Sequence, residues 1–309
     1  MRFSNARVAQ RRSSQPRCSS NRLAYKHGYH AGNAADILKH TVLVCLMHHM
    51  RLKAKPFIYV DTHAGAGVYD LGSDEAVTLR EYDSGISLLA RAASADDVVL
   101  PVAISTLLSI VDEERRGYPG SPLVARALCR PGDSLFLCER AELEHERLVK
   151  AVGDAPQVTA LCTDGYKALT NRQTCPQAGK SRALVLVDPP YQYGSDTDQI
   201  VRLVQHLGTH WRSARVAIWY PITRDVARND RLHAEVRAAS EFECLAVEMR
   251  SRSGGEGVEG SDGGLGDGGM LGSGMLLVQP PYGIEAQLVD ELLPVLGSAL
   301  NQEGQVTHL

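Results

Sequence analysis

The sequence has no apolar run approaching the roughly 20 residues that a membrane-spanning helix needs, so we expect no membrane association. Its seven cysteines show no CxxC pair or other metal-ligand spacing. Reduced thiols in an intracellular protein are therefore expected, and no metal. With 309 residues, 44% hydrophobic and 22% charged, the chain is globular. It is long enough for one domain with an insertion or for two small domains.

Acidic residues are almost missing from the first part of the chain. Residues 1–56 carry eleven Arg and Lys against one acid, Asp36, so this segment holds about +10 and the remainder about −13 of the net charge of −3. The net charge argues against a nucleic-acid partner, whereas a basic N-terminal face could meet phosphates.

Residues 1–23 contain six Arg, many Ser and no acid. An organellar transit peptide, a disordered arm or a wrongly chosen start codon would share this composition, so we expect a mitochondrial or plastid protein in the first case and a cytoplasmic one otherwise.

An apolar, β-branched run at 183–187 is followed directly by the tetrapeptide Asp-Pro-Pro-Tyr. This pattern predicts a buried parallel strand that opens into a rigid loop. Because the prolines fix φ and donate no N–H, the Asp188 carboxylate and the Pro189 carbonyl become a fixed pair of acceptors beside the ring of Tyr191. They suit a flat ring that bears an NH2 group, such as adenine. A plain strand-to-loop turn is the alternative, and we interpret Gln-Pro-Pro-Tyr at 279–282 as such a turn because its first residue is a neutral amide.

A second buried strand is expected at 57–61, where it ends in an acid shortly before a Gly-x-Gly sequence at 65–67. Nucleotide-binding α/β folds use this arrangement to bring backbone close to a ligand. The third glycine of the dinucleotide fingerprint is missing, since Asp70 stands in its place. A nicotinamide oxidoreductase is thereby disfavoured. A ligand without a phosphate, such as S-adenosylmethionine, fits better.

A buried helix is expected shortly before that strand. Gly32 or Asn33 can cap it, and its apolar residues recur at three- and four-residue spacing. Asp36, Lys39 and His40 fall near one another on this helix.

The next strand that ends in an acid, 134–139, comes much later than a simple β-α-β unit allows. The helical pattern at about 75–117 therefore predicts a small inserted subdomain. Further strands are expected at 158–162, 215–221, 244–249 and 275–278. Residues 254–274 hold eleven glycines and should form a disordered hairpin loop.

Several polar residues at the ends of these strands face the expected ligand crevice. Glu139 should accept ribose hydroxyls, and Asp164 could reach the cofactor adenine. Cys138 and Cys162 also lie near the crevice, and we interpret both as core residues.

Six sequences occur in a fixed order: His-Ala-Gly-Asn-x-Ala-Asp-x-Leu-Lys-His, Asp-Thr-His-Ala-Gly-Ala-Gly, Tyr-Pro-Gly-Ser-Pro, Asp-Gly, Asp-Pro-Pro-Tyr and Trp-Tyr-Pro. Together they resemble the bacterial large-subunit (23S) ribosomal RNA adenine-N6 methyltransferase J family, from about residue 23 to 282. The resemblance implies an α/β, Rossmann-like methyltransferase domain over 24–309 with the helical insertion, after the basic extension 1–23. It also implies S-adenosylmethionine as the cofactor and ribosomal RNA as the partner. We expect a monomer.

By this resemblance Asp188 is the catalytic acceptor, assisted by Pro189 and Tyr191. Tyr25 and Lys39 would contact the RNA. The residues implied for the S-adenosylmethionine site are His40, His63, Gly65, Ser121, Glu139, Asp164, Gly165 and Asp188.

Three departures from the family are expected. Residues 1–22 are extra, and the glycine tract replaces a short charged turn. The C-terminal residues after Val306 are expected to end before the family's usual closing strand, which could weaken a sheet edge. The expected reaction is N6-methylation of an adenosine that is flipped onto the Asp-Pro-Pro-Tyr loop. DNA adenine methylation is the nearest alternative, because this loop does not distinguish ribose from deoxyribose. A non-catalytic RNA-binding protein on the same fold is the other.

Overall fold

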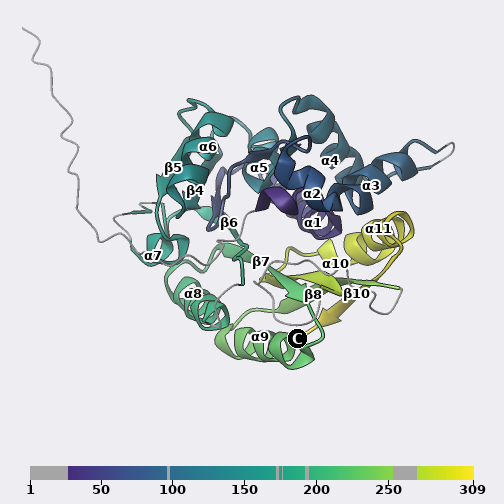
Figure 1. Ribbon diagram of the computed structural model, residues 1–309. Coiled ribbons are helices and arrows are strands. Elements are labelled where there is room, and N and C mark those ends of the chain that lie inside the picture. The colour runs from purple at the N-terminus through teal and green to yellow at the C-terminus, as the bar shows by residue number, and fades with distance from the viewer. Residues whose placement is uncertain (1–26, 96–97, 172–173, 176, 192–194, 253–269) are drawn as a thin grey trace, which may run out of the picture.

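The computed structural model describes residues 27–95, 98–171, 174–175, 177–191, 195–252 and 270–309 (Figure 1). The basic extension 1–23, Tyr25 and most of the glycine tract 254–274 lie outside the described residues. Residues 272–274, the last three of the expected glycine-rich loop, belong to a strand, so the predicted C-terminal end of that loop was wrong.

An eight-stranded sheet forms the centre, in the order β10-β8-β9-β7-β6-β1-β4-β5. Strands β5, β4, β1, β6 and β7 pair in parallel, while β9 and β10 run antiparallel to their neighbours. The strands are β1 (Phe57–Asp61), β4 (Ser134–Glu139), β5 (Val158–Cys162), β6 (Arg182–Val187), β7 (Ala214–Ile222), β8 (Cys244–Ser251), β9 (Gly272–Val278) and β10 (Gln302–His308). The expected strands and the mostly parallel α/β class are confirmed.

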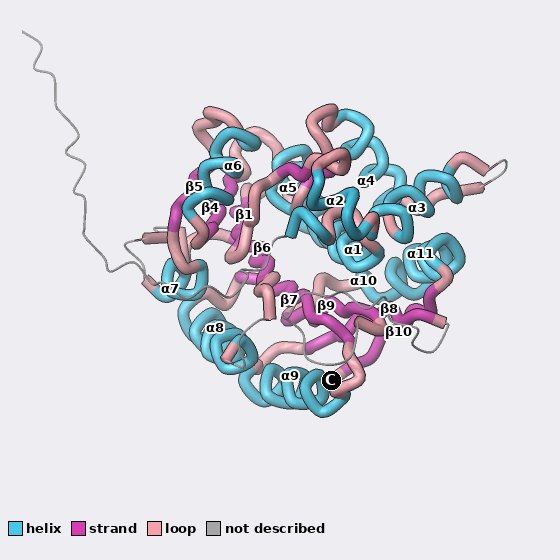
Figure 2. The backbone as a smooth tube through the Cα atoms, in the orientation of Figure 1, coloured by secondary structure: helices cyan, strands magenta, loops and turns pink. Residues whose placement is uncertain are grey.

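Helices cover both faces of the sheet (Figure 2). Because β1, β4 and β6 are parallel central strands, their side chains enter two cores alternately. Tyr59 and Leu184 pack into one core and Val60 and Val185 into the other. The first core receives α1 (Ala34–Arg51), α5 (Ser121–Leu128), α6 (Glu142–Val152) and α11 (Leu293–Leu300). The second receives α7 (Gly165–Thr170), α8 (Asp196–His210) and α9 (Val226–Ala239).

The chain between β1 and β4 is mainly helical. It contains α2 (Asp74–Leu79), α3 (Ile86–Ala93) and α4 (Val102–Glu113), and the two-stranded pair β2 (Val68–Tyr69) and β3 (Tyr118–Pro119) stands at its ends. Figure 1 shows these helices beside α1, to which they present apolar side chains such as Ile104 and Leu107. Among the described residues, no helix is long and apolar enough to cross a membrane.

Two expectations are corrected at the edges of the sheet. The chain does have a closing strand, because β10 pairs with β8 from Gln302 to His308. A π-helical turn (Gln287–Leu292), α10 (Ile284–Ala286) and α11 lead into it. Cys138 is buried as expected, but Cys162 is exposed, since it is the last residue of the edge strand β5.

The strand order places a switch point at the centre of the sheet. From β1 the chain continues outward to β4 and β5, and it then returns to the other side of β1 as β6 and β7. Loops from adjacent strands diverge at such a point and leave a crevice at the carboxyl ends. Asp61 is paired in register with Leu186, two residues before Asp188. The fold therefore brings the two acidic strand ends together.

Candidate active site

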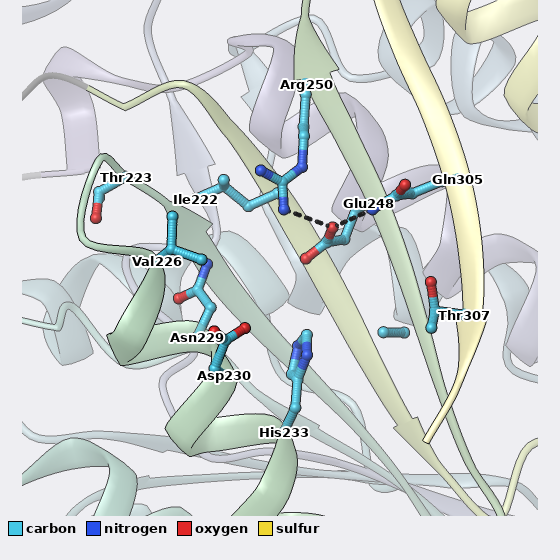
Figure 3. Close-up of a pocket in the computed structure, with 11 residues that line it drawn as sticks. Ile222, Thr223, Val226, Asn229, Asp230, His233, Glu248, Arg250, Gln305 and Thr307 are labelled. Atoms are coloured by element: carbon cyan, nitrogen blue, oxygen red, sulfur yellow. Dashed lines mark hydrogen bonds and ion pairs between the residues drawn. The ribbon is translucent and has the colours of Figure 1, made fainter.

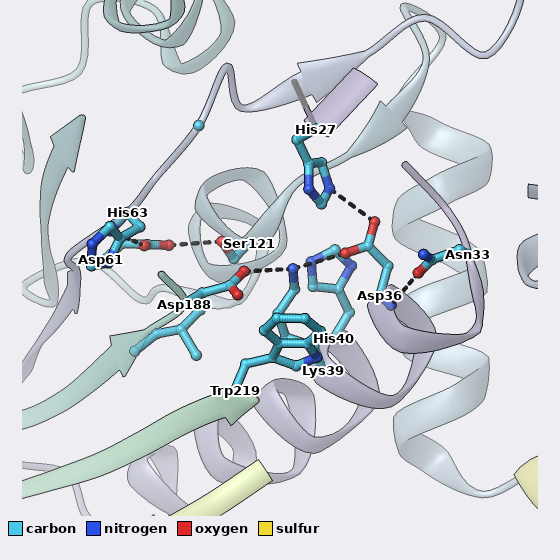
Figure 4. Close-up of polar contacts among 12 residues, drawn as sticks. His27, Asn33, Asp36, Lys39, His40, Asp61, His63, Ser121, Asp188 and Trp219 are labelled. Carbon is cyan, nitrogen blue, oxygen red and sulfur yellow. Dashed lines mark hydrogen bonds and ion pairs between the residues drawn. The ribbon is translucent and has the colours of Figure 1, made fainter. Parts of the chain in front are cut away.

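The Asp188 carboxylate lies at the carboxyl end of β6, and its side chain is 17% exposed. Its Oδ2 accepts a hydrogen bond of 2.7 Å from Lys39 Nζ (Figure 4). Pro189 follows and is buried, so the backbone directly after Asp188 is restrained. The Asp188 side chain is thus oriented by Lys39 and still partly open to a ligand.

Lys39 comes from the buried face of α1 and lies between two carboxylates. Its Nζ is 2.8 Å from Asp36 Oδ1 as well as 2.7 Å from Asp188, and only 5% of its side chain is exposed. Asp36 in turn accepts from Gly32 N at 2.9 Å and lies 3.1 Å from His27 Nε2. Figure 4 shows these side chains in a continuous line. The structure therefore places Lys39 as a buried support for Asp188, not at a surface where the expected RNA contact would be made.

Two opposing effects set the charges in this line. Burial by itself raises the pKa of Asp36, but the Lys39 ammonium and His27 lower it well below its usual range. Burial likewise lowers the pKa of Lys39, and the attraction of Asp188 and Asp36 outweighs it and raises the pKa well above its usual value. Both groups are therefore ionised at neutral pH.

The Tyr191 ring lies differently from the sequence-based expectation. Tyr191 is only 4% exposed, its hydroxyl donates to Trp219 O at 2.8 Å, and the Arg228 guanidinium lies over its ring. Little ring surface is open for a base to stack on. Trp219 is the half-buried aromatic residue beside Lys39 and Asp188 (Figure 4).

A second carboxylate, Asp61 at the end of β1, is fully buried. Its Oδ2 accepts from Tyr59 Oη at 2.8 Å and from Ser121 Oγ at 2.7 Å, and its Oδ1 accepts from His63 N at 3.2 Å. Ser121, which was expected to line the cofactor site, is the first residue of α5, and its hydroxyl donates to the Asp61 carboxylate. Sequence reasoning noted the acid at this strand end but assigned it no role.

The titration of Asp61 gives a test of this arrangement. Burial raises its pKa to about 6, although the hydroxyls of Ser121 and Tyr59 favour the charged form. In the unfolded chain the value is about 3.9. Between these values the folded state binds more protons than the unfolded state, so the stability contribution falls as the pH rises. The Asp61→Asn variant lacks this titrating group. The unfolding free energy of the variant minus that of wild type, measured by urea unfolding, should therefore increase by about 2–3 kcal/mol from pH 4 to pH 7. A difference that stays constant with pH would contradict this account.

Two histidines of the expected cofactor site are neutral. Burial lowers the pKa of His40 to about 3 and that of His63 to about 4. His40 Nδ1 lies 2.8 Å from Tyr118 Oη, and its Nε2 is buried without a partner among the described residues. His63 Nδ1 lies 2.8 Å from Thr62 Oγ1. Both can therefore offer a ring nitrogen to a ligand without bringing a charge.

The remaining expected cofactor residues lie at the ends of β1, β4 and β5. Glu139 Oε2 accepts from Gly65 N at 2.9 Å, and its Oε1 accepts from Ala141 N at 2.7 Å, so the carboxylate is fixed at the crevice. Asp164 Oδ1 accepts from Lys167 N at 3.1 Å and caps α7. Gly165 is buried against the Thr62 backbone, and any side chain there would collide with it. The fold therefore places these residues at the carboxyl ends of neighbouring strands, and their contact with a cofactor stays a prediction.

A separate polar cavity of about 180 Å³ lies between α9, β8 and β10 (Figure 3). Its most buried charge is Glu248, whose carboxylate accepts from Tyr220 Oη at 2.9 Å, Arg250 Nη2 at 2.9 Å and Gln305 Nε2 at 2.7 Å. Three donors satisfy this carboxylate, so Glu248 contributes to holding β7, β8 and β10 together.

The chain is similar over most of its length to known proteins. The family model described as "Ribosomal RNA large subunit methyltransferase D, RlmJ" matches residues 54–308. A protein of Haemophilus influenzae named "Ribosomal RNA large subunit methyltransferase J" is 34% identical over 283 residues, which are 91% of this chain and 95% of that protein. Its namesake from Escherichia coli K12 is 34% identical over 287 residues, with the same coverage.

Among solved structures, protein LPL1258 from Legionella pneumophila has a TM-score of 0.73 and 25% identity, covering 90% of this chain and 98% of that one. These comparisons confirm the resemblance that the sequence motifs suggested. The chain belongs to the RlmJ family of ribosomal RNA large subunit methyltransferases.

Proposed function

We propose that this chain transfers a methyl group from S-adenosylmethionine to N6 of an adenosine in large-subunit ribosomal RNA. The observation that carries the proposal is the partly exposed Asp188 carboxylate, held by Lys39 at the switch point of the sheet. Family membership supports the RNA substrate. The choice of N6 rests on the acceptor chemistry of the loop that Asp188 begins.

The residues at the strand ends fit the cofactor. When bound, S-adenosylmethionine supplies an electrophilic methyl group on a sulfonium. The fixed Glu139 carboxylate has lone pairs left for the two ribose hydroxyls. The buried, unpartnered Nε2 of neutral His40 is a polar atom that a ligand can satisfy. Gly165 lets the start of α7 lie directly against Thr62, just after the end of β1.

The chemical role of the Asp-Pro-Pro-Tyr loop is to orient the amino group of the target base. Asp188 and the Pro189 carbonyl each accept one N6 hydrogen, which reduces delocalisation of the nitrogen lone pair into the ring and directs it toward the methyl group. As the bond from N6 to the methyl carbon would form and the bond from that carbon to sulfur would break, the carboxylate would stabilise the positive charge on N6. The leaving group would be S-adenosylhomocysteine, and the surplus N6 proton would pass to solvent through the hydrogen bond to Asp188. Lys39 holds this carboxylate in one orientation through their 2.7 Å contact. Catalysis is therefore mainly positioning and charge placement.

The target adenosine must leave its helix to reach this loop. Trp219 already offers an aromatic surface beside Asp188, whereas stacking on Tyr191 requires its buried ring to become uncovered when RNA binds. Flipping the base onto this edge of the sheet places the amino group next to the two acceptors.

The proposal predicts that labelled methyl enters RNA and is recovered as N6-methyladenosine. The test compares purified large-subunit ribosomal RNA with matched RNA and DNA stem-loops, followed by nucleoside analysis. If only the DNA stem-loop became labelled, the substrate would be DNA and the proposed RNA substrate would be wrong. RNA binding without any transfer would indicate a non-catalytic protein on the same fold.

A further inference from the structure

A stack of side chains joins α9 to the loop that carries Asp188. The Arg228 Cζ lies 5.0 Å from the centroid of the Tyr191 ring. The Tyr191 and Trp219 ring centroids are 6.0 Å apart, and Lys39 Nζ lies 6.0 Å from the Trp219 ring. Lys39 is itself paired with Asp188. This group of side chains is therefore connected to the Asp188 carboxylate in two ways. Lys39 forms an ion pair with it, and Tyr191 follows Asp188 by three positions in the same loop.

Tyr191 has a backbone conformation that needs support. Its φ is +52°, in the left-handed region that is sterically disfavoured for a residue with a side chain. Such a conformation persists only when its surroundings hold it. Two hydrogen bonds do so: Arg228 Nη2 donates to Tyr191 O at 3.2 Å, and Tyr191 Oη donates to Trp219 O at 2.8 Å.

Arg228 has the geometry for this task. It is half-buried in the first turn of α9, and one guanidinium both donates to the Tyr191 carbonyl and covers the Tyr191 ring. A planar, delocalised cation with five donors can do both at once, whereas a lysine ammonium is a point charge that cannot. Tyr191 is consequently fixed at its carbonyl, at its ring and at its hydroxyl.

We propose that Arg228 is a positioning residue for methyl transfer, which acts through Tyr191 to hold the Asp188 carboxylate and the Pro189 carbonyl in their catalytic geometry. Arg228 touches neither the cofactor nor the target base in this role. The inference rests on the proposed function and adds a residue of α9 to it. Removing the guanidinium should loosen the loop, and the misplaced acceptors should slow the chemical step.

The kinetic experiment uses Arg228→Met and Arg228→Lys in the full chain. Arg228→Met should lower the single-turnover rate at saturating cofactor and RNA by about 10- to 100-fold, because small misplacements of reacting groups have effects of this size. The dissociation constant for S-adenosylmethionine should change by less than about twofold, since Glu139 and His40 are untouched. Arg228→Lys should recover part of the rate through its charge over the ring.

Arg231→Met is the matched control on the same helix. Its guanidinium pairs with Asp198 at 2.6 Å and with Glu235 at 2.7 Å, and half of its side chain is exposed. This variant also removes an arginine from α9, but the ion pairs described for Arg231 are with α8 and α9 and not with residues 188–191. Its rate should equal that of wild type.

Tryptophan fluorescence provides a measurement that does not depend on activity. The chain has two tryptophans, and Trp211 is 2% exposed, so quenching by acrylamide reports mainly on half-buried Trp219. Quenching should increase in Arg228→Met, because Tyr191 no longer packs firmly against Trp219. Arg231→Met should leave it unchanged.

Three results would overturn the inference. The first is a wild-type rate in Arg228→Met with unchanged quenching. The second is an unchanged rate at saturating RNA with a higher KM for RNA and a smaller salt dependence, which would make Arg228 a phosphate contact. The third is a rate loss that Arg231→Met shares. If wild-type protein itself transfers no methyl group, the proposed function fails, and the quenching comparison alone decides whether Arg228 holds the loop.

Discussion

Replacing Asp188 by Asn should lower methyl transfer to large-subunit ribosomal RNA by at least about 10²–10³-fold, the loss found when one preorganised electrostatic contact to a transition state is removed. Asn has the same shape, but it lacks the negative charge that stabilises the developing charge on N6, and its NH2 group cannot accept. Asp188→Ala should abolish the remaining transfer. The measurement is single-turnover transfer with nucleoside analysis.

Cofactor binding separates this effect from a general loss of structure. Glu139, His40 and Gly165 lie on other elements, so both variants should bind S-adenosylmethionine nearly as wild type does. Asp198→Asn is the matched control, because that carboxylate is on α8 and its side chain is 47% exposed. Unchanged turnover in Asp188→Ala would remove Asp188 from the mechanism.

Replacing Lys39 by Met should lower the free energy of unfolding by about 3–5 kcal/mol, the usual loss when one partner of a buried ion pair is removed. The side chain is 5% exposed, and its removal leaves Asp36 and Asp188 without their shared cation. Turnover should also fall strongly, because Asp188 loses the group that orients it. Urea unfolding and single-turnover assays measure the two effects.

Between pH 4 and pH 7 the contribution of Asp36 to stability should be constant in wild type but should depend on pH in Lys39→Met. In wild type the pKa of Asp36 is lowered, so its stabilising contribution is present above the unfolded value of about 4 and is lost as the pH falls. Without Lys39, burial dominates and raises that pKa, so stability should fall as the pH rises from 4 to 7. Adding Asp36→Asn should restore stability but not turnover. An unfolding free energy equal to that of wild type would contradict this account.

Some parts of the fold were predicted correctly because their signals are local. Apolar runs of strand length gave β1, β4 and β6, and Asn33 caps α1 by accepting from Asp36 N at 2.9 Å. The errors arose where neighbours outweigh composition. Gly272 and Gly274 lie in β9 because β7 and β8 pair with this strand on both sides. The Tyr220 ring packs against Gly274, where it occupies the position that a Cβ atom would take. The polar C-terminal sequence likewise forms a strand because the edge of β8 is there to pair with it.

The site was predictable in its residue types but not in its contacts. Sequence motifs placed Asp188, Glu139 and Gly165 at or just beyond the ends of recognisable strands, where the structure has them. The burial of Lys39 was not predicted, because no local pattern shows that its ammonium would lie against a carboxylate 149 positions away. Arg228 has no sequence signal at all, and it becomes visible only through its contact with Tyr191.

The sequence by itself determined the strands, the acids at their ends, the capped first helix and the family, because periodicity and motif spacing act over a few residues. Only the tertiary structure decided which charges meet: Lys39 between Asp36 and Asp188, and Ser121 on Asp61. The physical reason is that burial and pairing set the charge and orientation of these groups. Both depend on the order of strands in the sheet, which brings together residues that are far apart along the chain.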